Sequence, residues 1–135
     1  MEDVHQQQNY EKELAELHVN LQSSAKWFYW IAGLSIINTL INYFGGGVSF
    51  LVGLGITQLI EGIVFEASAA VKLIALVIEI VLSSVFAIFG YFALKLEKWS
   101  FYTGIVLYFI DGLIFLLVQD WLSIAFHAFV LFALF

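Results

Sequence analysis

Five apolar segments follow one another along most of this chain, and they constrain its fold more than any other feature of the sequence. The segments are 26–44, 48–66, 72–95, 99–119 and 120–135. The first four approach or exceed the roughly 20 residues that a helix needs to cross the hydrocarbon core of a bilayer. The apolar runs are continuous rather than alternating, which disfavours strands. We therefore predict an all-α fold, a polytopic transmembrane helical bundle of four to five helices.

The composition agrees with lipid as the solvent for most of the chain. Hydrophobic residues make up 62% of the 135 residues and charged residues only 12%. A soluble domain of this length has too little interior to bury so many apolar side chains. Tryptophan prefers the headgroup level of a membrane, and all four tryptophans lie at the start of a segment: Trp27, Trp30, Trp99 and Trp121. The lipid bilayer is thus the first predicted partner, and the composition suggests a small bacterial inner-membrane protein.

Charge and cysteine content disfavour several classes of function. The net charge is −6 and all five basic residues are lysines, so a nucleic-acid partner is not expected. The chain has no cysteine, which removes disulfides, thiolate metal sites and cysteine nucleophiles. The motifs of metalloproteases, phosphate-binding loops and serine hydrolases are missing as well. An enzyme is therefore the less favoured class, and the sequence assigns no cofactor.

Residues 1–25 form an acidic, glutamine-rich leader ahead of the first segment. Its apolar positions are spaced 4, 3 and 4 residues apart, as on one face of a helix; they are Tyr10, Leu14, Leu17 and Leu21. An acidic leader is unlike a signal or transit peptide. The predicted division is a polar N-terminal helix at 1–25 and a transmembrane domain at 26–135. We expect the stripe to pack on a neighbouring chain or a cytoplasmic loop, and a solvated extension of the first membrane helix is the alternative.

The fifth segment has 16 residues and is short for a full span. It is compatible with a tilted span, a re-entrant helix or a bent continuation of the fourth segment. If the fourth helix ran on unbroken, four phenylalanines would meet water, which is unfavourable. We therefore predict a break at residues 118–121, and the break brings His127 near Asp111 or Glu61.

The lysines indicate an orientation. With an even number of crossings between them, the leader and the turn after the second segment share one side of the membrane. That side would carry Lys12, Lys26 and Lys72, and the other side Lys95 and Lys98. Lysine is enriched on the cytoplasmic side, so the count favours a cytoplasmic N-terminus.

Four ionisable side chains lie inside four different apolar segments: Glu61, Glu79, Asp111 and His127. Counted from the predicted N-terminal edge of the membrane they lie 5 to 8 residues deep, or about 8–12 Å at 1.5 Å per residue. Ionisable groups within a membrane are costly and are often functional. We predict one polar layer that binds protons or cations, with Asn38, Gln58 and Tyr108 as supporting polar residues.

Three functions are compatible with such a layer. The first is a small proton or cation channel or carrier, because buried carboxyl groups and histidine can load and release protons. The second is a non-catalytic accessory or structural subunit of a larger membrane complex, and both of these predict a homo-oligomer or a complex partner. The third is a metal-dependent membrane enzyme with the same four residues as ligands, although the Glu-x-x-His pair of bundle di-iron proteins is absent. The four groups could also serve only as hydrogen-bond partners between helices.

Overall fold

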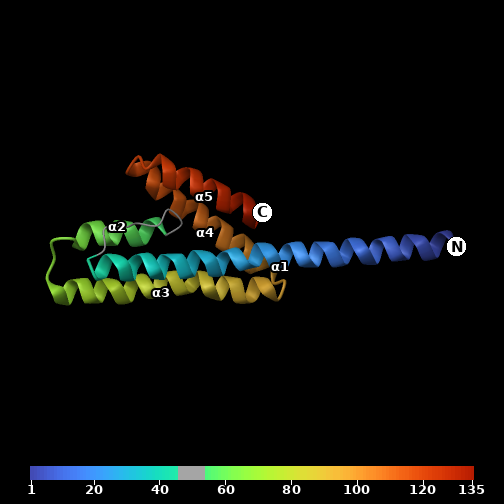
Figure 1. Ribbon diagram of the computed structural model, residues 1–135, viewed down its shortest axis with the longest axis horizontal. Coiled ribbons are helices and arrows are strands. Elements are labelled where there is room, and N and C mark those ends of the chain that lie inside the picture. The colour runs from blue at the N-terminus through green and yellow to red at the C-terminus, as the bar shows by residue number, and fades with distance from the viewer. Residues whose placement is uncertain (46–53) are drawn as a thin grey trace.

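The computed structural model describes residues 1–45 and 54–135, and this part of the chain forms five helices (Figure 1). They are α1 (Glu2–Tyr43), α2 (Gly55–Val64), α3 (Ala69–Leu94), α4 (Lys98–Leu117) and α5 (Trp121–Leu134). The all-α prediction is confirmed. Among the described helices, α3 and α4 are long and apolar enough to cross a membrane, with mean hydropathies of 2.5 and 1.8.

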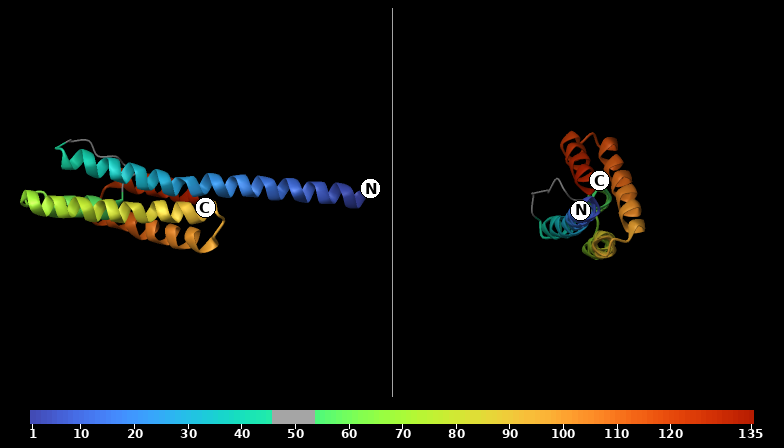
Figure 2. Two further views of the ribbon diagram at one scale, coloured as in Figure 1. Left: turned by 90° about the horizontal axis from the view of Figure 1, so that it is seen from below. Right: turned by 90° about the vertical axis from the view of Figure 1, so that its right-hand side faces the viewer.

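Helix α1 contains both the leader and the first apolar segment in 42 continuous residues. Its buried residues begin at Ala25, and the part before that residue extends beyond the other helices (Figures 1 and 2). Within a single chain the leader is thus a solvated extension of the first helix. Packing of its apolar stripe on a neighbouring chain stays a prediction.

Helix α2 does not cross back toward the leader. It has 10 residues, which is about 15 Å and too short for the roughly 30 Å of a bilayer core. The Leu54 N–H donates to Ser35 Oγ, and Asn42 Nδ2 donates to Glu61 Oε2; both contacts join residues 19 apart. A constant offset means that α1 and α2 run in the same direction. The prediction of a spanning helix at 48–66 is therefore wrong for 55–64, and 48–53 lie outside the described residues.

The parallel course of α2 changes which turns share an end of the bundle. Since α2 ends beside the end of α1, the turn between α2 and α3 lies opposite the leader, and α3 runs back to the leader end (Figure 1). Lys72 therefore lies at the end opposite the leader, whereas Lys95 and Lys98 lie at the leader end. The sides predicted for these three lysines relative to the leader are wrong.

The predicted break before the fifth segment is confirmed, because α4 ends at Leu117 and α5 begins at Trp121. Gln119 has φ of 56°, a left-handed conformation that ends α4. The Asp120 carboxylate then caps α5, accepting from Ser123 Oγ at 2.6 Å and from the Ser123 N–H at 3.2 Å. The fifth segment is thus a separate helix rather than a continuation of the fourth.

An aromatic cluster holds α1, α3 and α4 together. The fully buried Phe28 ring lies 6.2 Å from the Phe89 ring and 6.1 Å from the Phe101 ring, centroid to centroid. Gly104 on α4 faces the same ring, and a Cβ at this position would lie 2.5 Å from it. Helix α4 can approach α1 this closely because residue 104 has no side chain.

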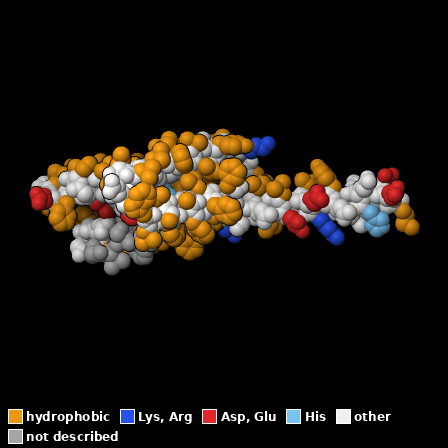
Figure 3. Space-filling model, turned by 90° about the horizontal axis from the view of Figure 1, so that it is seen from above, with side chains coloured by type: hydrophobic (Ala, Val, Ile, Leu, Met, Phe, Trp, Pro, Cys, Tyr) orange, Lys and Arg blue, Asp and Glu red, His pale blue; other side chains and the backbone are white. Residues whose placement is uncertain are grey.

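The bundle buries many polar side chains and exposes many large apolar ones. The buried polar residues are Ser35, Asn38, Thr39, Thr57, Glu79, Ser83, Ser100, Asp111, Ser123 and His127. Large aliphatic side chains instead cover the outer faces of α3 and α4; Ile74, for example, is 61% exposed. Figure 3 shows hydrophobic side chains over much of one face of the bundle. The bundle therefore shields polar side chains from solvent beside its apolar core.

Candidate functional site

Helix α2 begins without a side-chain cap of its own, because its N-cap residue is Leu54. Asp111 on α4 supplies the missing acceptors: its Oδ2 accepts from the Gly55 N–H at 2.6 Å and its Oδ1 from the Ile56 N–H at 2.9 Å. Ser35 Oγ on α1 accepts from the Leu54 N–H at 3.0 Å. A helix N-terminus combines unpaired N–H groups with partial positive charge. The Asp111 carboxylate satisfies both.

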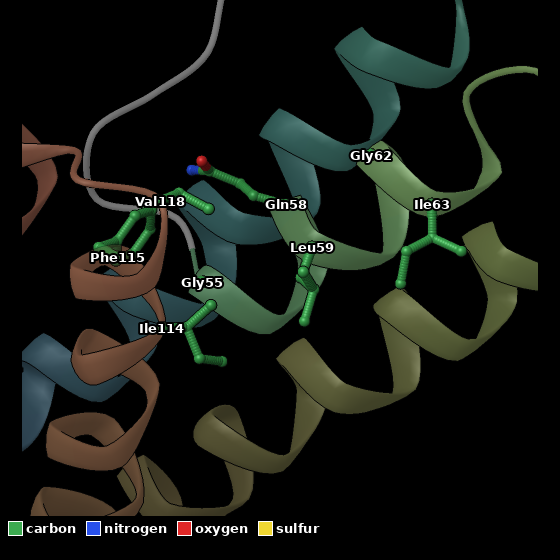
Figure 4. Close-up of a pocket in the computed structure, with 8 residues that line it drawn as sticks. All are labelled: Gly55, Gln58, Leu59, Gly62, Ile63, Ile114, Phe115 and Val118. Atoms are coloured by element: carbon green, nitrogen blue, oxygen red, sulfur yellow. The ribbon is translucent and has the colours of Figure 1, made fainter.

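The contact between α2 and α4 depends on Gly55. A Cβ at residue 55 would lie 2.7 Å from the backbone oxygen of Asp111 and 3.1 Å from the Phe115 ring. A backbone oxygen cannot rotate away, so a larger residue would force the two helices apart. Figure 4 shows Gly55 opposite Ile114 and Phe115, at one end of an apolar groove of about 280 Å³ between the two helices.

His127 on α5 reaches the same carboxylate. Its Nε2 lies 3.2 Å from Asp111 Oδ2, and its Nδ1 lies 3.1 Å from the Ser123 carbonyl oxygen. A carbonyl oxygen can only accept, so Nδ1 carries a proton. The contact between Nε2 and Oδ2 then needs one further proton, held either by the imidazole or by the carboxyl group. Asp111 and His127 therefore share one proton at this contact.

Aromatic rings shield this pair. The Tyr108 ring stacks on His127 at 4.3 Å with an interplanar angle of 11°, and the Phe115 ring lies at 4.9 Å. His127 is 2% exposed and Asp111 is 6% exposed. Charges buried in this way are screened little by water or salt. The predicted proximity of His127 to Asp111 is confirmed, and Tyr108 contacts this pair through the histidine.

Glu61 and Glu79 face a different cavity, a half-open groove of about 740 Å³ formed by α1, α2 and α3. Glu61 Oε2 accepts from Asn42 Nδ2 at 2.5 Å. Thr39 lines the groove and lies close to both carboxyl groups. The Thr39 hydroxyl is thus a hydrogen-bond donor shared by the two carboxyl groups in this groove.

The two glutamates also act on each other electrostatically. Two ionised carboxylates close together in a weakly polar environment repel strongly. Such pairs are stable when one carboxyl group holds a proton, as in aspartic proteases, or when a cation neutralises them. Lys72 lines the same groove and supplies one positive charge there. The Glu61/Glu79 pair has the chemistry to hold one proton or one small cation beside it.

The structure brings the four predicted site residues together as two pairs rather than as one layer. Asp111 on α4 contacts Gly55, the first residue of α2. Glu61 is six residues further along α2, about 9 Å. The two pairs therefore lie apart, and the membrane edge from which their depths were counted lies at the end opposite the leader. Binding of protons or cations by these four residues stays a prediction. Among the described residues no group of three or more His, Asp or Glu side chains could hold a metal ion. The metal-enzyme alternative thus has no assembled site there.

Of the predicted supporting residues, Gln58 lines the Glu61/Glu79 groove and Asn38 is buried in α1. Figure 4 shows the Gln58 side chain leaving α2 on the side away from Leu59 and Ile63. The sequence reasoning missed Ser35, Thr39 and Asn42 on α1. Their spacing of 4 and 3 residues puts them on one face of a helix, and that polar face within an apolar segment is the signal that could have found them.

No protein-family model, curated protein or solved structure matches the chain. Its fold and its two buried pairs are therefore the basis for assigning a function. The Glu61/Glu79 groove is the more accessible of the two, since Asp111 and His127 are enclosed by side chains.

Proposed function

We propose that this chain is an integral membrane protein that carries or conducts protons or small cations, with the Glu61/Glu79 groove as the binding site. The exposed aliphatic side chains on α3 and α4 support a membrane environment, as do the serine, threonine, aspartate and histidine side chains buried beside the apolar core. Lipid can solvate the outer residues, and only neighbouring helices can satisfy the inner ones.

The lysines support a cytoplasmic leader more strongly in this fold than in the sequence alone. Four lysines lie at the leader end, Lys12, Lys26, Lys95 and Lys98, and only Lys72 lies at the other end. An excess of lysine marks the cytoplasmic side. In this orientation the Glu61/Glu79 groove, at the end opposite the leader, opens away from the cytoplasm.

One observation carries the proposed function: the half-buried Glu61 and the buried Glu79 face one groove with Thr39 beside both carboxyl groups, and the two glutamates act on each other electrostatically. Two ionised carboxylates in this arrangement are costly inside a membrane. A proton or a small cation in the groove removes the repulsion between the two groups. Thr39 and Gln58 add neutral polar groups to the same cavity.

The short helix α2 also supports transport. It begins inside the bundle and ends near the far end of α1, so it is a half-length helix lined by polar contacts. Ion and substrate sites in transporters are commonly built at such interrupted helices, because backbone groups there face the interior. Ser35 and Asp111 accept hydrogen bonds from the N–H groups at the start of α2. Glu61 is then the charged group of α2 that faces the groove.

Ion flux in proteoliposomes tests the proposal. A pH gradient and, separately, gradients of Na⁺ and K⁺ are imposed on vesicles containing the native chain, the double variant E61Q/E79Q, or E66Q. Glu66 is an exposed carboxylate in the turn after α2, so E66Q is the matched control. We expect flux of at least one ion in the native chain and in E66Q, and background flux in E61Q/E79Q. Background flux of all three ions in the native chain would refute the proposal.

The leader supports a second candidate, an accessory subunit of a membrane complex or a homo-oligomer. Most of its apolar stripe is exposed in the described part of the chain: Tyr10 is 62% exposed and Leu17 is 55% exposed. Purification in mild detergent distinguishes the cases. A stoichiometric partner lost in L14D/L17D supports the accessory subunit, a homo-oligomer lost in the same variant supports self-association, and a monomer contradicts both. Val19→Asp, on the opposite face of the leader, is the control.

A further inference from the structure

We propose that Asp111 is a positioning residue for the Glu61/Glu79 site, and that the proton it shares with His127 controls how firmly it holds α2. The inference rests on the proposed function, because it assigns a means of regulation to the same site. It starts from the observation that one carboxylate contacts both the first turn of α2 and a buried histidine.

The first step concerns what holds α2 in place. A helix of ten residues is marginal by itself in the absence of packing, so its position depends on its anchors. The anchors are the Asp111 and Ser35 contacts at its N-terminus and the Asn42 contact at Glu61. A helix moves as a rigid rod over this length. A displacement at Gly55 therefore reaches Glu61, about 9 Å along α2, and changes its distance from Glu79.

The second step concerns charge. When the shared proton is on His127, Asp111 is ionised and accepts two charge-assisted hydrogen bonds from α2, which also places negative charge at the helix N-terminus. When the proton is on Asp111, the carboxyl group is neutral and Oδ2 donates to Nε2, so the same two bonds are weaker. If a second proton binds, both His127 Nε2 and Asp111 Oδ2 carry a hydrogen. Two donors cannot form a hydrogen bond with each other. Acidification therefore loosens the anchor of α2.

The surroundings of the pair add only one other titratable group. From α4 the Tyr108 ring lies against His127, and from α3 the Phe86 ring lies 6.0 Å from Tyr108. The start of α2 contributes backbone N–H groups, and α1 contributes the Ser35 hydroxyl beside them. From α5, the Ser123 carbonyl oxygen contacts His127. Asp111, His127 and Tyr108 are thus the titratable groups of this site in the described part of the chain.

The absence of cysteine makes a direct test possible, because E61C/E79C introduces the only two thiols of the chain. Cross-linking of these thiols by a short bifunctional reagent reports the distance between α2 and α3. The full chain with E61C/E79C is measured in lipid nanodiscs, first without a further substitution and then with D111N, H127Q or the matched control D120N. Asp120 caps α5 through the same kind of contacts as Asp111 but does not touch α2.

We expect the cross-linking yield, compared with E61C/E79C without a further substitution, to fall several-fold in D111N. It should fall less in H127Q and stay unchanged in D120N. On acidification the yield should fall in E61C/E79C and in D120N by more than the intrinsic reactivity of a thiol with the reagent falls, and this acid response should be absent in H127Q. The reporter lacks both glutamates, so the acid response cannot come from them. Equal yields in all backgrounds, or an acid response that survives in H127Q, would overturn the inference.

Two further measurements guard against a variant that fails to fold. Gly55→Ala displaces α2 by contact with the Asp111 backbone and alters no titratable group, so it should lower the yield as D111N does. Amide exchange at residues 54–58 of the unsubstituted chain should lose protection as the pH falls, after correction for intrinsic exchange. Protection that is independent of pH would overturn the inference. None of these readouts requires ion binding, so loss of flux with an intact cross-linking pattern would refute the proposed function alone.

Discussion

Removing the Asp111 side chain should destabilise the fold more than removing any other single carboxylate of the described chain. In Asp111→Ala the N–H groups of Gly55 and Ile56 lose acceptors at 2.6 and 2.9 Å, and His127 Nε2 loses its partner at 3.2 Å. Gly55 and His127 are buried and Ile56 is partly buried, so water replaces the carboxylate poorly at these groups.

The expected loss follows from the number of groups left unpaired. A buried donor without an acceptor costs about 1–3 kcal/mol, so three such groups give roughly 3–6 kcal/mol after partial relaxation. Asp120→Ala is the matched comparison. It removes two contacts to Ser123 at the partly exposed start of α5, a helix cap worth about 1 kcal/mol.

Reversible unfolding in mixed detergent and SDS measures both variants against the native chain. We expect Asp111→Ala to lower the free energy of unfolding by at least about 2 kcal/mol more than Asp120→Ala. Asp111→Asn should fall between the two, since its amide oxygen still accepts from one N–H. Equal losses for the two alanine variants would refute the idea that Asp111 is the anchor of α2.

Two other predictions follow from the packing and from the α5 cap. Gly104→Ala places a methyl group against the confined Phe28 ring, so it should be about 1–3 kcal/mol less stable than Gly33→Ala, whose Cβ meets nothing; equal unfolding free energies would contradict this. The pKa of Asp120 is held below its usual value by hydrogen bonds from the Ser123 hydroxyl and N–H. Its stabilisation is therefore present above the unfolded-state pKa of about 3.9 and is lost as pH falls through the folded-state value. The difference in Tm between the native chain and D120N should shrink below about pH 4, and a difference independent of pH would contradict the cap.

The sequence predicted those features that depend on continuous hydrophobicity and on local turn chemistry. The ends of α3, α4 and α5 follow from apolar runs, and the break before α5 follows from the cost of exposing four phenylalanines. Depth counting along helices also predicted correctly that His127 meets Asp111, because α4 and α5 are consecutive and antiparallel.

The rest depends on the direction of α2, which hydrophobicity alone does not determine. A 19-residue apolar segment at 48–66 is long enough to span, so nothing in its composition marks it as a half-length helix. Its N-terminus is capped by Asp111, a residue 56 positions away, and no local capping residue announces where α2 begins. Depth counting also gives one coordinate only. It could not reveal that Glu61 and Glu79 face one groove while Asp111 and His127 lie elsewhere.

The central claim is that the Glu61/Glu79 pair binds one proton or one small cation, and infrared titration of the carboxyl groups tests it most directly. The full chain, E61Q/E79Q and the exposed-carboxylate control E66Q are compared in nanodiscs at neutral pH, with and without Na⁺ or K⁺. We predict either a band of a protonated carboxyl group or a cation-dependent change in the carboxylate bands. This signal should be present in the native chain and in E66Q and missing from E61Q/E79Q. Identical spectra for the native chain and E61Q/E79Q, apart from the loss of two ordinary ionised carboxylates, would contradict the claim.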